Sequence, residues 1–416
     1  PSNFMVEAHA EASDEWLHSY YYFNDELPAE EDFKKSIADY LTFEFNMISH
    51  GRGYLFNYEN EKQDEKKNLT LEGRHWGKFS IGDLFYSKIG KSIDGNKVDK
   101  IIGNFAYITR KESNNGLDGF INYDKSYLNE NYPVITIGNE TAEPFVQTFP
   151  FFTGTNVNIL LPKIEMSKHS LMFIARSLKM HKEKYSYLHG INSKRLKAQM
   201  ILLPTDESGR PDYKFMEDYI RQCGQKMLQD YFEFISPRLK NFTLKKIMKL
   251  EGRHWGKFSI GDLFSISSGK RLRKEDMTAG NKPFIGASDS NNGITEFVSN
   301  SNVSEDSNVL GVNYNGSIVE NFYHPYECLF SDDVKRFKLK AYDGNRYVYL
   351  FLKQAILTQK NKYTYGYKFN ETRMKRQIIL LPVDKSGQPD YQFMEDYIKN
   401  LEHDILKEYF DIKFSS

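Results

Sequence analysis

The chain has 416 residues, 40% of them hydrophobic, and its formal net charge at pH 7 is zero. This length is enough for two or three domains that each bury a core of their own. The two cysteines, Cys223 and Cys328, lie far apart without metal-type spacing, which excludes a disulfide scaffold and favours a cytoplasmic protein. No apolar run reaches the length of a membrane span and the first residues lack a secretory signal, so we expect no membrane association.

Charge is distributed unevenly along the chain. Residues 1–70 carry 6 basic and 15 acidic side chains, whereas residues 71–416 carry 50 basic and 41 acidic ones. Within the acidic segment, residues 28–49 are predicted to form a helix, because Pro28 suits a first helical position and an acidic first turn complements the helix dipole. We expect this helix to pack against the rest of the chain; the alternative is a docking surface for another subunit. Its apolar residues recur at helical spacing: Phe33, Ile37, Leu41, Phe45 and Ile48.

A block of sequence is duplicated without change and frames the rest of the chain. The sequence LEGRHWGKFSIGDLF occupies Leu71–Phe85 and again Leu250–Phe264, an offset of 179 residues. A second shared frame follows in each copy: Tyr185–Pro204 in the first resembles Tyr363–Pro382 in the second, at an offset of 178 residues. Between these frames the two copies differ widely. A solenoid stacks three or more short repeats, so we expect instead two copies of one fold that each carry their own contact surface.

Each copy mixes strand-like and helix-like segments, which predicts an α+β fold. Short runs of β-branched and aromatic residues between Gly- and Asn-rich turns indicate strands at residues 105–109, 133–137, 156–161 and 200–203. Residues 170–178 indicate a short helix. The predicted division is an acidic helical segment and linker at 1–70, a first domain at 71–205, a spacer helix and linker at 206–249, a second domain at 250–383 and a second spacer helix at 384–416.

A spacer helix is predicted after each domain, and the two helices match. The first begins PDYKFMEDYI and the second PDYQFMEDYI, with Asp212 and Asp390 as N-terminal caps. Both continue with apolar residues three and four positions apart, the spacing of a coiled coil. We expect Pro237 to end the first helix, so that each helix has about 20 residues. Since neither helix can bury its apolar stripe alone, we expect the two to pair.

Three patterns that would carry catalysis are incomplete. Amino-methyltransferases use a loop with two adjacent prolines, and none of the 13 prolines here has a proline neighbour. A Gly-Lys-Ser triplet resembles the end of a phosphate-binding loop, but Phe85 stands where the partner glycine is required. Asp390, Asp411 and Lys413 formally fit a nuclease pattern, yet the first copy lacks the lysine and Asp390 is explained as a helix cap. We therefore expect a non-catalytic chain that binds no metal or cofactor itself.

Basic residues interleaved with tyrosines recur at the same place in both copies. A single run of this kind is usually a solvated face, but its recurrence favours contact with the phosphates of a nucleic acid. The predicted phosphate-contacting residues are Lys182, Lys184, Lys194, Arg195 and Lys197 in the first copy and Lys360, Lys362, Arg373, Lys375 and Arg376 in the second.

Loops that hold Arg, Lys, Asn and Ser suit the edges of bases, because Arg pairs with guanine and Asn with adenine. The Asn-Gly pairs in these loops fit a simple turn equally well. The predicted base- or groove-contacting residues are Lys91, Arg110, Lys111, Asn114 and Asn115 in the first copy and Lys270, Arg271, Arg273, Ser290, Asn291 and Asn292 in the second.

Together these features resemble the DNA-specificity subunit of type I restriction–modification systems and the similar subunit of type IIB enzymes. The resemblance covers residues 71–416 and rests on an ordered set: Trp76–Phe85, its copy Trp255–Phe264, the turn Ser267–Lys270, the run Ile378–Pro382 and the helix after each domain. It implies two tandem target-recognition domains that each read one half of a split, asymmetric site in double-stranded DNA. It also implies DNA methyltransferase subunits in two copies, and a restriction nuclease subunit, which supply S-adenosylmethionine and magnesium.

The chain departs from that family in two respects. Its helices are shorter, which changes the expected spacing of the half-sites, and residues 1–70 have no clear counterpart. One alternative is therefore the C-terminal specificity region of a single-chain restriction–modification enzyme. Another is a tandem scaffold for protein or glycan ligands, which the net charge of +9 in residues 71–416 disfavours because a neutral ligand does not require it.

Overall fold

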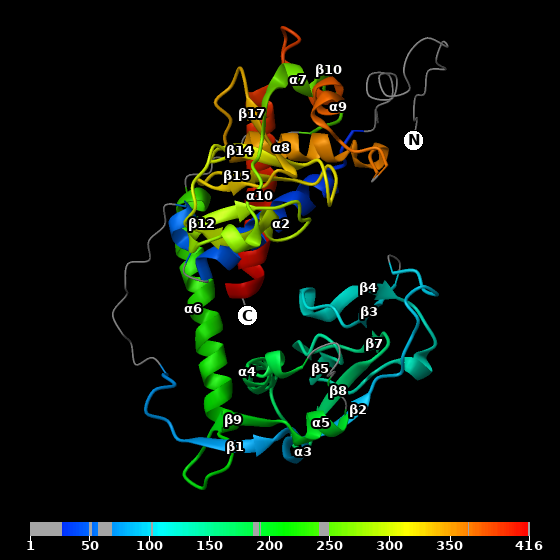
Figure 1. Ribbon diagram of the computed structural model, residues 1–416, viewed down its shortest axis with the longest axis vertical. Coiled ribbons are helices and arrows are strands. Elements are labelled where there is room, and N and C mark those ends of the chain that lie inside the picture. Colours follow the sequence, from blue (N-terminus) through cyan, green and yellow to red (C-terminus); the bar gives the residue numbers. More distant parts are fainter. Residues whose placement is uncertain are drawn as a thin grey trace. The chain divides into compact units, whose positions relative to one another are not determined.

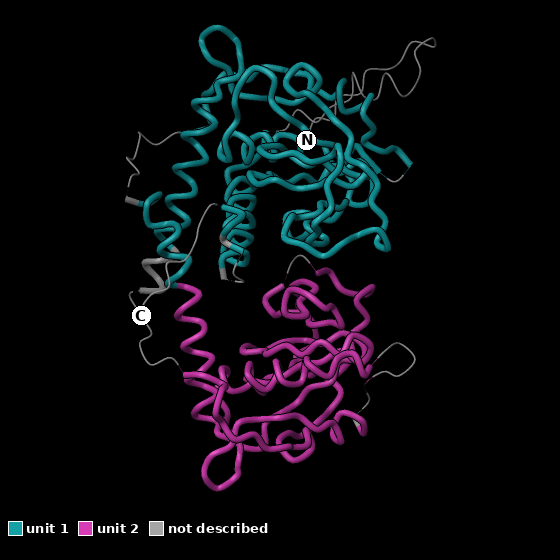
Figure 2. Tube along the Cα trace, turned by 60° about the vertical axis from the view of Figure 1, so that its left-hand side comes forward, with its two compact units in different colours: residues 1–62, 229–416 teal, residues 63–228 magenta. Residues whose placement is uncertain are grey.

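The chain forms two compact units in the computed structural model (Figure 2). Unit 2 comprises residues 63–228 and contains the first repeat; unit 1 comprises residues 1–62 and 229–416 and contains the second. None of the helices that the structure describes is long and apolar enough to cross a membrane. The described residues are 27–49, 52–56, 69–100, 103–185, 191, 193–240, 249–364 and 366–414.

The first repeat is built from two sheets, a two-stranded ribbon and short helices (Figure 1). Its elements are β1 Trp76–Ser80, α3 Ile81–Leu84, β2 Phe85–Ile89, β3 Phe105–Ile108, η2 Asn114–Gly116, β4 Leu117–Ile121, η3 Lys125–Tyr127, β5 Val134–Gly138, β6 Pro144–Gln147, β7 Phe151–Thr153, β8 Val157–Pro162, α4 Lys168–Lys179, η4 Lys182–Lys184, α5 Ser193–Ala198, β9 Met200–Pro204 and α6 Tyr213–Lys240. The sheets have the orders β2-β8-β5-β6 and β4-β3-β7, and β1 pairs with β9.

The second repeat has the same topology, and an additional N-terminal helix belongs to its unit. The elements of this unit are α2 Glu30–Ser49, η1 Gly53–Phe56, β10 Trp255–Ser259, α7 Ile260–Leu263, β11 Phe264–Ser268, η6 Lys274–Asp276, β12 Ala279–Ile285, η7 Asn291–Gly293, β13 Ile294–Val298, β14 Val309–Asn313, β15 Asn321–His324, β16 Leu329–Phe330, β17 Val334–Leu339, α8 Arg346–Leu357, η8 Lys360–Lys362, α9 Glu371–Arg376, β18 Ile378–Pro382 and α10 Tyr391–Phe414. The sheets have the orders β11-β17-β14-β15 and β13-β12-β16, and β10 pairs with β18.

The two shared sequence frames of each repeat meet in the two-stranded ribbon. β1 pairs antiparallel with β9, from Trp76 opposite Pro204 to Ser80 opposite Met200, and β10 pairs with β18 in the same register. The side chain of Ser80 then accepts a hydrogen bond from the Asp83 amide and caps α3. The duplicated block is therefore one strand of a ribbon whose other strand is the second frame, which explains why both frames recur together.

The predicted α+β fold is confirmed, and so are its strands and caps. β3, β5, β8 and β9 lie where strands were predicted, and α4 covers the predicted helix at residues 170–178. Asp212 accepts a hydrogen bond from the Phe215 amide and Asp390 from the Phe393 amide, as expected of N-terminal caps.

The prediction that Pro237 ends the first spacer helix is wrong. α6 continues through this proline and has 28 residues, and α10 has 24, so both helices are longer than expected. A proline removes one amide donor from the helix, and here the next residue, Arg238, is held by an ion pair to Glu44 at 2.9 Å. The tertiary contact therefore outweighs the local preference.

The apolar stripe of α6 has two parts. Met216, near its start, lies in the core of unit 2, whereas Tyr231, further along, lies in the core of unit 1. There Tyr231 lines a small cavity together with Ile405 and Leu406 of α10. The expected pairing of the two spacer helices stays a prediction, because α10 packs mainly against α2 and α8.

α2 packs against α8 and α10 within unit 1, although it lies first in the sequence (Figure 1). The ring centroid of Phe33 lies 4.7 Å from that of Phe351 and 5.4 Å from that of Tyr397. The hydroxyl of Ser36 donates to Oε1 of Gln354 at 2.9 Å. The helix predicted at residues 28–49 is confirmed, and so is its packing against the rest of the chain.

Candidate nucleic-acid interface

Three connections that are distant in the sequence meet at one end of the first repeat: those that follow β3, β5 and α4. The guanidinium of Arg110 after β3 pairs with Glu140 after β5 at 2.5 Å. The ammonium of Lys182 after α4 pairs with Glu112 at 2.6 Å and with Glu143 at 2.9 Å. The structure therefore brings together two predicted residues, Arg110 and Lys182, that the sequence separates widely.

The same three connections meet in the second repeat, but with different side chains. The amide of Asn313, at the end of β14, donates to the backbone oxygen of Ser288 at 2.9 Å. Lys360 after α8 pairs with Glu320 at 2.5 Å, which repeats the pair of Lys182 with Glu143. The scaffold is thus shared, while the groups that it presents differ.

The lysine–glutamate pairs have a structural role in this scaffold. Burial alone would raise the pKa of Glu143, but the hydrogen bonds and charges of Lys179 and Lys182 lower that pKa below its usual value. The glutamate is therefore ionised at neutral pH and holds the segment after α4 to the start of β6. Phosphate contact by Lys182 and Lys360 stays a prediction, and it would compete with these pairs.

The asparagine pairs before each Gly form left-handed turns. Asn114, Asn115, Asn291 and Asn292 have φ angles of 51°, 53°, 50° and 50°. The side-chain amide of Asn292 donates to the backbone oxygen of Tyr323 at 3.0 Å, and the side-chain amide of Asn115 donates to the backbone oxygen of Val146 at 3.2 Å. These inward bonds are at odds with base contacts by Asn115 and Asn292, because the amides already pair with backbone across the fold.

The first residues of the second turn remain at the surface. Ser290 and Asn291 are exposed, and the Asn291 amide donates to the backbone oxygen of Ile294 at 3.1 Å. The hydroxyl of Ser290 lies 3.1 Å from that of Ser288. Base contacts by this pair and by Asn114 stay a prediction.

Two of the predicted phosphate-contacting residues turn inward. Lys362 is buried and its amine donates to Oε1 of Gln377 at 2.6 Å; burial lowers its pKa to about 7. Arg373 lies over the ring of Tyr367 at 3.7 Å and donates to the backbone oxygen of Lys368 at 2.7 Å. This geometry is at odds with phosphate contact by Lys362 and gives Arg373 an internal packing role.

The remaining phosphate candidates lie at the surface on or near the short helices α5 and α9. Lys375 pairs with Glu371 at 2.7 Å within α9, and Arg376 is half-buried beside it. The exposed members of the set are Lys184, Lys194, Arg195, Lys197 and Lys375. Their phosphate contacts stay a prediction.

The remaining groove candidates lie on loops that are stabilised locally. The ammonium of Lys91 donates to the backbone oxygen of Ser126, and Lys111 pairs with Asp118 at 2.5 Å. In the second repeat Arg273 pairs with Asp276 at 2.8 Å. Lys270 and Arg271 precede Arg273 on the same loop and are exposed.

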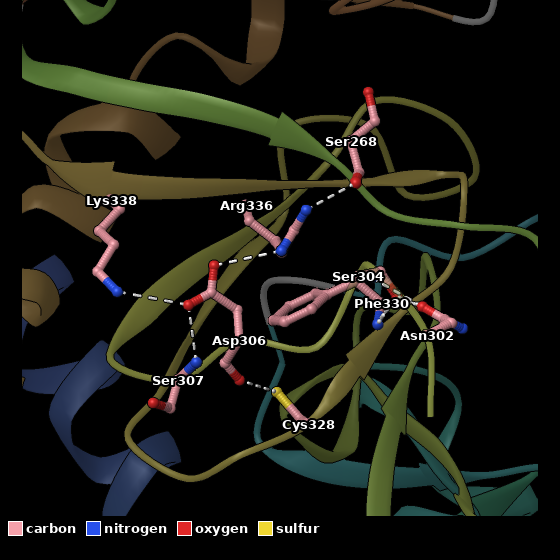
Figure 3. Close-up of polar contacts among 9 residues, drawn as sticks. All are labelled: Ser268, Asn302, Ser304, Asp306, Ser307, Cys328, Phe330, Arg336 and Lys338. Atoms are coloured by element: carbon pink, nitrogen blue, oxygen red, sulfur yellow. Dashed lines mark hydrogen bonds and ion pairs between the residues drawn. The ribbon is translucent and has the colours of Figure 1, made fainter. Parts of the chain in front are cut away.

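A basic strand in the second repeat was not singled out in the sequence. Arg336 of β17 pairs with Asp306 at 3.3 Å and donates to the backbone oxygen of Ser268 at 3.0 Å, and Lys338 pairs with Asp306 at 3.5 Å (Figure 3). The signal was the sequence VKRFKL, in which basic and apolar residues are mixed within one strand, whereas the equivalent strand β8 reads VNILLP. Among the described residues, no group of three or more His, Cys, Asp or Glu side chains is placed to hold a metal ion.

Comparison with known proteins identifies both repeats. A family model described as "Type I restriction modification DNA specificity domain" matches residues 73–228 and 252–408. The chain is 50% identical over 329 residues to the type II restriction enzyme specificity subunit S.BcgI of Heyndrickxia coagulans, which covers 79% of this chain and 95% of that protein. It is also 48% identical over 62 residues to the type II restriction enzyme and methyltransferase RM.BcgI of the same organism, 15% of this chain and 10% of that one.

Solved structures of specificity subunits are also similar. The S subunit of a type I restriction–modification system from M. genitalium aligns with a TM-score of 0.42 and 16% identity, covering 83% of this chain and 94% of that chain. The HsdS subunit from Thermoanaerobacter tengcongensis aligns with a TM-score of 0.27 and 12% identity, covering 83% and 98%. The two family matches coincide with the two repeats, and the relative S.BcgI spans nearly its whole length on this chain. The chain therefore belongs to the family of type I restriction–modification DNA specificity domains, and it is a non-catalytic specificity subunit of a restriction–modification system.

Proposed function

We propose that the chain reads a split, asymmetric site in double-stranded DNA, with one domain for each half. The observation that supports this most directly is the end of each repeat where the same three connections meet with different side chains. The first repeat carries Arg110 and Lys111 after β3, whereas the second carries Ala287 and Ser288 at the equivalent positions. A shared scaffold that presents different donors and acceptors suits two different half-sites.

Phosphate contacts would hold the domains on the duplex without reading its sequence. Exposed lysines on α5 and α9, together with the loop of Lys270 and Arg271, supply positive charge for this purpose. Because Arg110 and Lys182 are held by carboxylates, their contact with DNA requires exchange of one anionic partner for another.

The partners we propose are two copies of a DNA methyltransferase subunit, together with nuclease activity. The identical frames give the chain two equivalent attachments, one for each repeat. S-adenosylmethionine and magnesium would bind to these partners, since the chain lacks the two-proline loop of amino-methyltransferases.

We infer that the relationship to RM.BcgI lies within residues 1–72. The family model leaves only three stretches unmatched, and the other two, residues 229–251 and 409–416, are too short for an aligned segment of 62 residues. α2 is then related to a segment of a restriction–methyltransferase subunit that this chain carries as part of itself. This relationship supports a partner of the same kind.

The test has two stages. The affinity of the purified chain for duplex DNA is measured across a salt series, and the methylome of a host is mapped with and without the chain and its methyltransferase partner. We expect binding that weakens as salt rises and an interrupted, asymmetric methylated motif. An uninterrupted motif would overturn the assignment of one domain to each half, and absence of DNA binding at every salt concentration would favour the scaffold for protein or glycan ligands.

A further inference from the structure

α2 lies on a face of unit 1 that we call the α2-binding face, formed by α8, α10 and the connection after β15. Phe33 lies 4.7 Å from Phe351, and Phe43 lies 6.2 Å from Tyr326, between ring centroids. With α2 in place, Leu350 of α8 is 1% exposed and Tyr326 is 6% exposed. The face is thus an apolar surface that a helix covers.

The repeat duplicates this face in unit 2, where none of the described residues covers it in the same way. Met172 of α4 occupies the position equivalent to Leu350 of the second repeat. Phe149 occupies the position equivalent to Tyr326. Met172 is 41% exposed and Phe149 is 75% exposed. Large apolar side chains are thus exposed in unit 2 at the positions that α2 covers in unit 1, which marks an interaction surface.

The aromatic pair that receives Phe33 in unit 1 is already formed in unit 2. Phe351 and Tyr397 lie 6.1 Å apart with their rings at 77°. Phe173 and Tyr219, at the equivalent positions of α4 and α6, lie 5.9 Å apart with their rings at 77°. The surface therefore has the geometry for an aromatic side chain without any rearrangement.

The charges of the surface in unit 2 indicate the kind of helix that fits it. A groove of about 470 Å³ beside α4 is lined by Val146, Lys168, Met172 and Arg176 among others. Lys168 is equivalent to Arg346, which binds Glu44 of α2 in unit 1. Arg176 is equivalent to Gln354, which binds Ser36 of α2. The lining holds three cations, Lys168, Arg176 and Lys179, and one anion, Glu143, which pairs with Lys179. This excess of positive charge beside apolar side chains suits an acidic, amphipathic helix, and α2 itself begins with three acidic residues.

We propose that this groove of unit 2 is the docking site for an acidic amphipathic helix of the restriction–methyltransferase partner subunit, a helix related to α2. The proposal rests on the proposed function, in which residues 1–72 are related to RM.BcgI. The chain then supplies one such helix itself, on unit 1, and takes the second from the partner, on unit 2. The inferred relationship of residues 1–72 to RM.BcgI points to the partner subunit as the source of the second helix.

The experiment uses the whole chain and a fluorescein-labelled peptide of residues 27–49, with Phe33 replaced by the photo-reactive benzoylphenylalanine. Fluorescence anisotropy measures binding of the peptide, and mass spectrometry maps the cross-link. We expect a cross-link to α4 or to the first half of α6. Met172→Glu should weaken binding about tenfold or more, because it removes an apolar contact and places a carboxylate between Lys168 and Arg176, where it repels an acidic helix and pairs with the cations meant for it. Tyr86→Glu is the matched control: Tyr86 is an exposed aromatic on β2, at the opposite edge of the sheet from β6, and its change should leave binding unaltered.

Each other outcome overturns the proposal. Equal affinities of the Met172→Glu variant and the unmodified chain would show that the groove is not the site. A cross-link to α8 or α10 would show that the peptide replaces α2 on unit 1. Chains that dimerise until Met172→Glu separates them would show that a second copy occupies the groove. Salt-dependent DNA binding by the same variants reports separately on the proposed function, because Met172 lies outside the DNA-contacting candidates.

Discussion

The carboxylate of Glu44 on α2 accepts two parallel hydrogen bonds from the guanidinium of Arg238 on α6, at 2.9 and 3.0 Å, while 1% of the Glu44 side chain is exposed. Arg346 of α8 donates a third bond to Glu44 at 3.0 Å and also contacts Glu402 of α10. Paired arginine–carboxylate bonds are strong and directional, so this buried network determines how α2 lies against three other helices.

Removing the charge of Glu44 should therefore destabilise unit 1. We expect Glu44→Gln to lower the free energy of unfolding by about 2–4 kcal/mol, because two half-buried arginines lose the carboxylate that they share and keep only Glu402. Urea unfolding monitored by circular dichroism measures this change. Glu30→Gln is the matched control, since Glu30 pairs only at the exposed start of α2 and its change should cost less than about 1 kcal/mol. Equal losses in both variants would contradict the role of the network.

Exposed lysines of α5 should contribute to DNA affinity without contributing to sequence preference. Replacing Lys194 and Lys197 together by Gln should weaken binding to all duplexes and reduce the slope of log affinity against log salt by about 2, one unit for each lost phosphate contact. Anisotropy titrations at several salt concentrations measure the slope. Lys226→Gln, an exposed lysine on α6, provides the control. An unchanged slope in the double variant would show that these lysines are only solvated.

The buried amine of Lys362 should make stability depend on pH. Its pKa is lowered by burial to about 7, from an ordinary value of 10.5 that applies to the unfolded chain. Between these values the unfolded state binds more protons than the folded state, so the free energy of unfolding rises with pH. Relative to Lys362→Met, the unmodified chain should gain roughly 1–3 kcal/mol between about pH 7 and 9.5.

The control for this experiment is the equivalent lysine of the first repeat. Lys184 is exposed, so Lys184→Met should leave the pH dependence of unfolding as it is. Urea unfolding at both pH values measures all three proteins. If the Lys362→Met variant shows the same pH dependence as the unmodified chain, Lys362 carries its charge in the folded state at neutral pH.

The repeats should be exchangeable in one direction only. Placing residues 250–383 also at the position of 71–205 leaves the α2-binding face intact, because α8 and β15 stay in place. The opposite exchange puts Lys168 at the position of Arg346, and so removes an arginine bond to Glu44. We expect the first chimera to fold and, with its partner, to methylate one half-site repeated in inverted orientation.

Methylome mapping of a host that carries the chimera and its methyltransferase partner measures this outcome. Urea unfolding of the opposite chimera, with residues 71–205 in both positions, should show a less stable unit 1. A folded first chimera that still marks the parental asymmetric site would contradict the reading of one half-site by each domain.

The sequence by itself determined the repeat, the fold class and the caps, because these depend on residues that are close together or identical. In each repeat the duplicated block and the second frame pair as the two strands of one ribbon. Because both frames recur in the sequence, their recurrence was sufficient to predict two copies of one domain. Short runs of apolar residues between Gly- and Asn-rich turns located the strands β3, β5, β8 and β9 for the same local reason.

Only the tertiary structure decided which polar residues face outward and what covers each repeat. Lys184 and Lys362 occupy the same position in the two repeats, yet one is exposed and the other is buried against Gln377. Periodicity does not distinguish them, because burial depends on side chains that arrive from elsewhere in the chain. In the same way, α2 covers Leu350 but not its counterpart Met172, and this difference arises from a helix that lies outside both copies of the repeat.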